Sequence, residues 1–171
     1  MLSPQQISHI NIEFLSENAL LLSWPDIICV KQHQAIIHLE KVIRHDFSHL
    51  ITESITSYNS LILYYNFEEI RNTRLIKRLR LLIENITINI EQNTSTQFSH
   101  EESKTINIPV YYGVNAGWDL EQIAQEKQRS IEEIIQLHSA HSYRSYALGF
   151  TPGFCYLASL SEELMMPRRA T

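Results

Sequence analysis

The chain has 171 residues, of which 44% are hydrophobic and 19% are charged, and its formal net charge at pH 7 is −5. This length allows one ordinary domain or two small ones with a real hydrophobic core. The acidic balance gives no support to a general nucleic-acid-binding role. The N-terminus lacks a basic start followed by an apolar segment, and no apolar run approaches the roughly 18 residues of a membrane-spanning helix. We therefore expect a soluble cytoplasmic protein that binds neither nucleic acid nor membranes.

The first part of the chain is predicted to form a small α+β domain. Residues 19–24 (ALLLSW) are expected to form a buried strand that ends at a Pro-Asp pair. An apolar stripe then predicts a helix that ends near His45. Residues 51–57 alternate and are rich in β-branched residues, so they predict a strand that pairs with residues 61–65. A second amphipathic helix is expected over residues 71–86, and this order of elements favours a small α/β sandwich.

A change of composition divides the chain. Residues 93–104 are polar and nearly free of apolar side chains, which predicts a linker. We therefore expect an N-terminal α+β domain over residues 1–92 and a second domain over residues 105–171. The second domain is expected to begin with a strand over residues 106–112. This strand should lie at an edge, because Pro109 cannot donate a backbone hydrogen bond to a neighbour.

Two short helices and a strand are expected next. Asp119 precedes the first helix and is followed three residues later by a glutamine, which is an acceptable helix start. Ser130 and Glu133 form a capping box that opens the second helix, and this helix is expected to end near His138. Residues 143–148 then predict a strand that leads into a glycine-containing turn.

The histidines and cysteines do not predict a metal site. Four histidines lie on or just after the first predicted helix, but their spacing does not gather them on one face, so exposed or helix-capping side chains are expected. They are His33, His38, His45 and His49. His138 and His141 lie at the end of a later helix, where an imidazolium ring suits the helix dipole. Cys29 and Cys155 are far apart and match no zinc pattern, so we expect reduced packing residues.

Common catalytic and phosphate-binding motifs are absent from the sequence. It contains no GxSxG, GxGxxG or GxxxxGK[ST] motif. The helix predicted over residues 71–86 carries a row of basic side chains on one side. They are Arg71, Arg74, Lys77, Arg78 and Arg80. Because Glu68, Glu69 and Glu84 dilute this charge, a solvated helix face is favoured over a site for phosphate or an acidic partner.

One segment concentrates backbone freedom. Two of the chain's four glycines, Gly149 and Gly153, lie in the sequence GFTPGFCYL with Pro152 between them. Glycine permits positive φ and proline fixes φ, so the segment predicts a semi-rigid turn with exposed backbone amides. Farther along, adjacent Arg168 and Arg169 follow a proline and could bind a carboxylate or phosphate through bidentate hydrogen bonds. On the residues alone, a structural turn and two surface arginines remain the alternative.

Several motifs in order carry a resemblance to a known family. They are IPVYYG, a pair of helices ending in LHS, the pattern YxxYxxGFxPGFxYL and the pattern LxxPRRA. This part of the chain resembles the KipI family, which includes the B component of 5-oxoprolinase (PxpB). The family has also been called allophanate hydrolase subunit 1 or carboxyltransferase-domain subunit 1. The resemblance is specific over residues 106–171 and weaker in the residues that precede the linker.

The resemblance implies both a fold and a reaction. It implies an α+β domain followed by a cyclophilin-like β-barrel, which would be incomplete here because family members continue past Thr171. It also implies hydrolysis of 5-oxoproline to glutamate, with ATP (and Mg) as co-substrate and no cofactor bound tightly to this chain. The implied partners are a homologous barrel subunit of KipA or PxpC type and a PxpA-type subunit. The alternatives are a KipI-like inhibitor of a sensor histidine kinase and a urea or allophanate pathway subunit.

The resemblance also assigns roles to particular residues. Arg168 and Arg169 are expected to hold anionic oxygens during catalysis. The expected substrate- or nucleotide-binding residues are Gly149, Phe150, Pro152, Gly153, Phe154, Tyr156 and His138. In this interpretation the glycines let backbone amides face a small carboxylate or phosphorylated ligand, while the phenylalanines pack the turn into the barrel. No metal ligand is expected.

Overall fold

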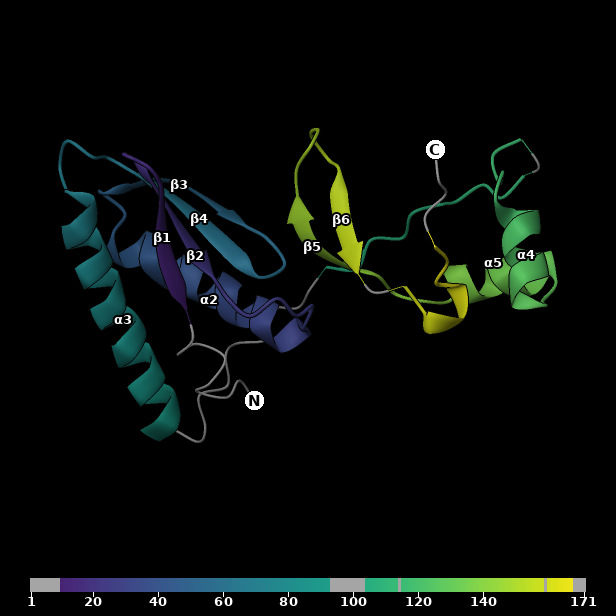
Figure 1. Ribbon diagram of the computed structural model, residues 1–171, viewed down its shortest axis with the longest axis horizontal. Helices are drawn as coiled ribbons and strands as arrows, with labels where there is room; N and C mark the ends of the chain where they lie inside the picture. The colour runs from purple at the N-terminus through teal and green to yellow at the C-terminus, as the bar shows by residue number, and fades with distance from the viewer. Residues whose placement is uncertain (1–9, 93–103, 114, 159, 168–171) are drawn as a thin grey trace. The chain divides into compact units, whose positions relative to one another are not determined.

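The computed structural model describes residues 10–92, 104–113, 115–158 and 160–167 (Figure 1). Contacts divide the chain into two compact units. The first comprises Met1–Glu101 with Tyr146–Tyr156, and the second comprises Glu102–Ser145 with Leu157–Thr171. None of the helices in the described ranges is both long and apolar enough to cross a lipid bilayer.

The first unit is built on a four-stranded antiparallel sheet. Its strands are β1 (Asn11–Ser16), β2 (Ala19–Ser23), β3 (Ile51–Thr56) and β4 (Ser60–Tyr65). They lie in the order β1-β2-β4-β3, so that β2 and β4 occupy the centre (Figure 1). The central strands are the most apolar, because strands with neighbours on both sides contribute most to the core.

Two helices, α2 (Val30–Asp46) and α3 (Asn72–Gln92), pack against this sheet. Leu20 and Leu22 of β2 pair with Leu63 and Leu61 of β4, so all four side chains point to the same face. That face is fully buried together with side chains from both helices. The helix contributions include Ala35, Ile36, Leu39 and Ile43 from α2 and Leu75, Leu79 and Ile83 from α3. The apolar stripe of each helix therefore faces the sheet.

The elements predicted for the first unit are confirmed, with one omission. β2, β3 and β4 begin and end within a residue of their predicted bounds, and α3 extends further than predicted, to Gln92. The sequence did not indicate β1. Only Ile12 of this edge strand is buried, so its sequence lacks the alternation that marks a half-buried strand.

The second unit contains two short helices and a single 3-10 turn in its described residues. These are α4 (Leu120–Lys127), α5 (Ile131–Ser139) and η1 (Glu162–Leu164). The predicted capping box at the start of α5 is confirmed, with the Ser130 hydroxyl accepting from the Glu133 amide and the Glu133 carboxylate accepting from the Ser130 amide. Both predicted helix starts are correct, but the Asp119 side chain does not cap α4.

The strand predicted over residues 106–112 is not observed. Residues 104–113 have no regular structure, and Ile106, Ile108 and Tyr111 are each more than two-thirds exposed. The prediction was wrong because an apolar run becomes a strand only when another strand pairs with it, and Pro109 removes one of the donors. The described residues form a mixed α+β structure with no closed barrel, so the cyclophilin-like barrel stays a prediction.

A two-stranded hairpin completes the fold. It consists of β5 (Arg144–Leu148), predicted from the sequence, and β6 (Cys155–Ala158), which the sequence did not indicate (Figure 1). The turn between the strands is the glycine-containing part of GFTPGFCYL. Tyr146 is the buried side chain of this hairpin, and residues 146–156 belong to the first unit.

Candidate functional site

The turn of the β5–β6 hairpin is held by three backbone hydrogen bonds. The Gly149 amide donates to the Phe154 carbonyl (3.1 Å), and the Phe154 amide donates to the Thr151 carbonyl (3.0 Å). A third bond runs from the Thr151 amide to the Gly149 carbonyl (2.8 Å). Two residues adopt positive φ, Phe150 at 64° and Gly153 at 81°. The segment is therefore the shaped turn that its glycines and proline predicted.

Two amides of this turn are left over. Pro152 has no N–H group, and the amides of Phe150 and Gly153 donate to no backbone carbonyl in the described residues. Both residues are exposed. Exposed backbone N–H groups at a turn are donors that an anion can accept. The turn can thus offer two N–H groups to a carboxylate or phosphate.

Three aromatic rings of the hairpin, those of Phe150, Phe154 and Tyr156, do not pack into a core. Phe150 is 87% exposed, Phe154 46% and Tyr156 38%. The rings instead contact one another edge to face, with centroids 5.7 Å apart for Phe150 and Phe154 and 5.1 Å apart for Phe154 and Tyr156. The expected packing of the phenylalanines into a barrel is not observed, because the described residues form no closed barrel around them. The three rings form an exposed ladder beside the turn.

Two further expectations about side chains are corrected. Cys155 is exposed on β6, with its Sγ atom 3.6 Å from the Gly153 carbonyl, so it is not a packing residue. His33, expected to be exposed or capping, is only 4% exposed on α2. A period-3.6 pattern could have placed His33 on the inner face, since Ile36 lies three residues further along the same stripe.

His138 lies in the second unit, on α5, within an aromatic cluster. Its Nδ1 atom shares a hydrogen bond of 2.5 Å with the Tyr112 hydroxyl, and its carbonyl accepts from the Tyr143 hydroxyl at 3.0 Å. The ring of His141 contacts that of Tyr143 edge to face. Burial, and secondarily the neighbouring Tyr112, raise the pKa of Tyr143, which keeps its hydroxyl protonated as a donor. The bond from Tyr112 holds the His138 ring, and the bond from Tyr143 satisfies its backbone carbonyl.

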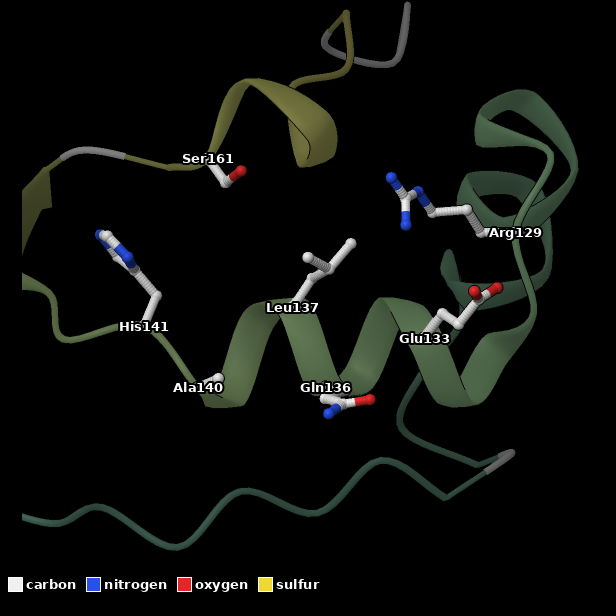
Figure 2. A pocket seen from close by; sticks show the side chains of 7 residues that line it. All are labelled: Arg129, Glu133, Gln136, Leu137, Ala140, His141 and Ser161. Atoms are coloured by element: carbon white, nitrogen blue, oxygen red, sulfur yellow. The ribbon is translucent and has the colours of Figure 1, made fainter.

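A shallow hollow of about 400 Å³ lies along the same helix, α5. Figure 2 shows Leu137 in its middle, Arg129 and Glu133 toward one end, and His141 facing Ser161 toward the other. The Arg129 guanidinium pairs with the carboxylate of Glu163, and Glu133 is engaged in the helix cap. The two charged side chains that line the hollow are therefore already engaged. The hollow has less capacity to bind an anion than its composition suggests.

The two arginines of the predicted site, Arg168 and Arg169, lie outside the described residues. Among the described side chains, no three His, Cys, Asp or Glu come together as possible metal ligands. The structure thus brings together Gly149, Phe150 and the other predicted hairpin residues, while His138 belongs to the other unit.

Comparison with known proteins identifies relatives along nearly the whole chain. A family model described as "Carboxyltransferase domain, subdomain C and D" matches residues 10–171. A protein from Haemophilus influenzae, named as the B component of 5-oxoprolinase, is 32% identical over 161 residues, which cover 94% of this chain and 70% of that protein. A protein of the same name from Bacillus subtilis is 29% identical over 164 residues, covering 94% of this chain and 67% of that protein.

A solved structure has a similar fold. The crystal structure of TTHA0988 superposes with a TM-score of 0.68 at 25% sequence identity. The matched region covers 91% of this chain but only 28% of that protein. The matched region is therefore one part of the larger TTHA0988 chain.

Proposed function

Because this chain belongs to the family of carboxyltransferase domains, subdomains C and D, we propose that it is the PxpB-type component of an ATP-dependent 5-oxoprolinase. The observation that carries the proposal is the similarity, over 94% of the chain, to two proteins named as the B component of 5-oxoprolinase. Such a component acts with partners. For these we propose a homologous barrel subunit of KipA or PxpC type and a PxpA-type subunit, with turnover only in the assembled complex.

The proposed reaction needs ATP because a lactam resists hydrolysis. Transfer of the γ-phosphoryl group to the lactam oxygen activates the ring carbon toward water. Water then adds to that carbon, the ring carbon–nitrogen bond breaks, and a second water releases phosphate. The balance is 5-oxoproline, ATP and two waters giving glutamate, ADP and phosphate. Negative charge develops on oxygen at each addition, and fixed N–H donors and cations stabilise such charge.

The hairpin turn supplies suitable donors for this chemistry. The unengaged amides of Phe150 and Gly153 would bind a carboxylate or a developing oxyanion. The ring ladder that begins at Phe150 would shield the ligand on one side. Arg168 and Arg169 would bind anionic oxygens through bidentate hydrogen bonds. ATP would bring its Mg²⁺, and no side chain of this chain is assigned to hold that ion.

The proposal is tested by measuring ADP release that depends on 5-oxoproline. The chain is mixed with the two partner subunits, and ADP is followed with and without 5-oxoproline. We expect release only when all components are present. The controls omit this chain, or supply this chain alone, and both should give no release above background.

Absence of release from a complex whose subunits are folded and associated would contradict the proposal. It would favour the binding role that the family resemblance also implies, inhibition of a sensor histidine kinase. A direct binding measurement with a kinase dimerisation domain would then decide, because an enzyme subunit has no reason to bind it tightly.

A further inference from the structure

We infer that His33 and Tyr58 are positioning residues, which hold Tyr146 and thereby fix the hairpin that carries the proposed binding turn. The contacts from which we infer this role all lie within the first unit. Its consequence for catalysis rests on the proposed function.

A buried hydrogen bond links helix α2 to strand β5. The His33 Nε2 atom lies 2.9 Å from the Tyr146 carbonyl oxygen, across a sequence separation of 113 residues. A carbonyl oxygen can only accept, so Nε2 must carry the proton and donate it. Both residues are buried, each with 4% exposure. Losing the donor would leave the carbonyl buried without this partner, which costs more than an exposed bond.

Ring contacts add to this bond. The imidazole of His33 lies 4.7 Å from the Tyr146 ring, measured between centroids. The Tyr58 ring, in the turn between β3 and β4, stacks on the Tyr146 ring at 5.2 Å with an interplanar angle of 9°. Helix α2 and the turn between β3 and β4, both in the first unit, thus contact the same tyrosine. Such aromatic pairs stabilise beyond the area that they bury.

Most side chains of the hairpin are not buried. Tyr146 is the buried residue of the described residues 144–158, and the other side chains are half-buried or exposed. Gly149, the first residue of the turn, lies only three residues after Tyr146 in the sequence. A change at His33 or Tyr58 should therefore release the turn while the four-stranded sheet stays folded.

Amide hydrogen exchange of the full chain tests the inference without substrate or partners. His33→Leu removes the donor at similar volume, and His33→Gln keeps an N–H donor at nearly the same reach. Tyr58→Ala removes the stacked ring from a half-buried turn, where it should not unfold the core. His45→Gln, at an exposed position on the same helix, is the matched control.

We expect exchange across residues 146–156 to be about five- to tenfold faster in His33→Leu and in Tyr58→Ala, as the loss of one buried interaction predicts. The Gly149 amide is the most direct probe, and exchange in β2 and β4 should not change. His33→Gln should recover part of the protection, and His45→Gln should match the wild type. Unchanged exchange in both His33→Leu and Tyr58→Ala would overturn the inference.

The assembled enzyme gives the second readout. In Tyr58→Ala the KM for 5-oxoproline should rise about as much as hairpin exchange does, with a smaller effect on kcat. Faster exchange with an unchanged KM would confirm the anchor but overturn its role in positioning a substrate-binding turn. A complex without any 5-oxoproline-dependent release would contradict the proposed function and leave the exchange result standing.

Discussion

Gly149 and Gly153 occupy the same turn but differ in their backbone conformation. Gly153 has φ of 81°, which an L side chain adopts at a cost of about 1–2 kcal/mol, although an added Cβ would meet no atom within 4 Å. A Cβ at Gly149 would meet the Tyr156 ring at an ordinary distance of 3.6 Å. We expect Gly153→Ala to lower the free energy of local opening of the hairpin by about that amount and Gly149→Ala to change it little. Amide exchange of the turn measures both, and equal effects would contradict the conformational argument.

His38 makes stability depend on pH. Burial, and secondarily the charge of Lys41, lower its pKa below the ordinary value of 6.5. The folded state therefore binds the proton less tightly than the unfolded chain. This difference makes the folded state more stable at higher pH. The stabilisation is fully present above the unfolded pKa of 6.5 and is lost as the pH falls through the lowered folded-state pKa.

We expect the free energy of unfolding of the wild type to fall more steeply between about pH 7 and pH 5 than that of His38→Gln. Denaturant titrations at a series of pH values measure the difference. His49→Gln, at an exposed position, is the control and should keep the wild-type slope. A His38→Gln slope equal to that of the wild type would show that other groups dominate in this range.

Arg168 is expected to bind anionic oxygens in the proposed reaction. A charge-assisted hydrogen bond contributes about 1.5–3 kcal/mol, so Arg168→Ala should lower kcat/KM of the assembled enzyme roughly 10- to 100-fold. Circular dichroism should show no loss of folded structure. Arg80→Ala, at an exposed position on α3, is the matched control. Equal kcat/KM in the two variants would remove Arg168 from the site.

The start of α5 offers a test of helix capping. The Ser130 hydroxyl accepts a hydrogen bond from the Glu133 amide (3.2 Å), and the Glu133 carboxylate accepts one from the Ser130 amide in return. Ser130→Ala should lower the stability of the second unit by about 1 kcal/mol, as the loss of an N-cap does elsewhere. Ser139→Ala, inside the last turn of the same helix, should have little effect. Amide exchange over α5 distinguishes the two variants.

The elements that sequence predicted are those in which local signals agree. The apolar stripe of α2, the alternation of β3 and the cap of α5 each point to one structure, and all three elements are observed. β6 was missed because its residues are exposed or half-buried and show no alternation. Residues 106–112 have the composition of a strand, but none of the described strands pairs with them. Pairing is a property of the fold and cannot be read from the segment that needs it.

The same distinction applies to the candidate site. The glycines and proline of GFTPGFCYL predicted the turn, because they restrict or free the backbone locally. Nothing local predicted that Tyr146 contacts His33 and Tyr58, since those contacts join residues far apart in sequence. The exposure of the Phe150 and Phe154 rings likewise depends on what surrounds them. Local chemistry was therefore predictable, and its placement in space was not.

The described residues form two hydrophobic cores of very different size. In the first unit, side chains from the sheet strands and from α2 and α3 form one large cluster. In the described part of the second unit, the buried cluster contains Ala124, Ile134 and Leu164, with partly buried neighbours around it. Since burial of apolar area drives folding, the second unit should be much less stable than the first.

We expect each core to stabilise mainly its own unit. Leu79→Ala, in the first core, should cost about 2–5 kcal/mol and lower the denaturant midpoint reported by Trp24, which is only 6% exposed. Leu164→Ala should instead accelerate exchange in α4 and α5 and leave the Trp24 transition in place. Trp118 is 79% exposed, so a Trp118→Phe background isolates the Trp24 signal. If Leu164→Ala moved the Trp24 midpoint as far as Leu79→Ala does, the two cores would form one cooperative structure, and the stability of the hairpin would depend on both.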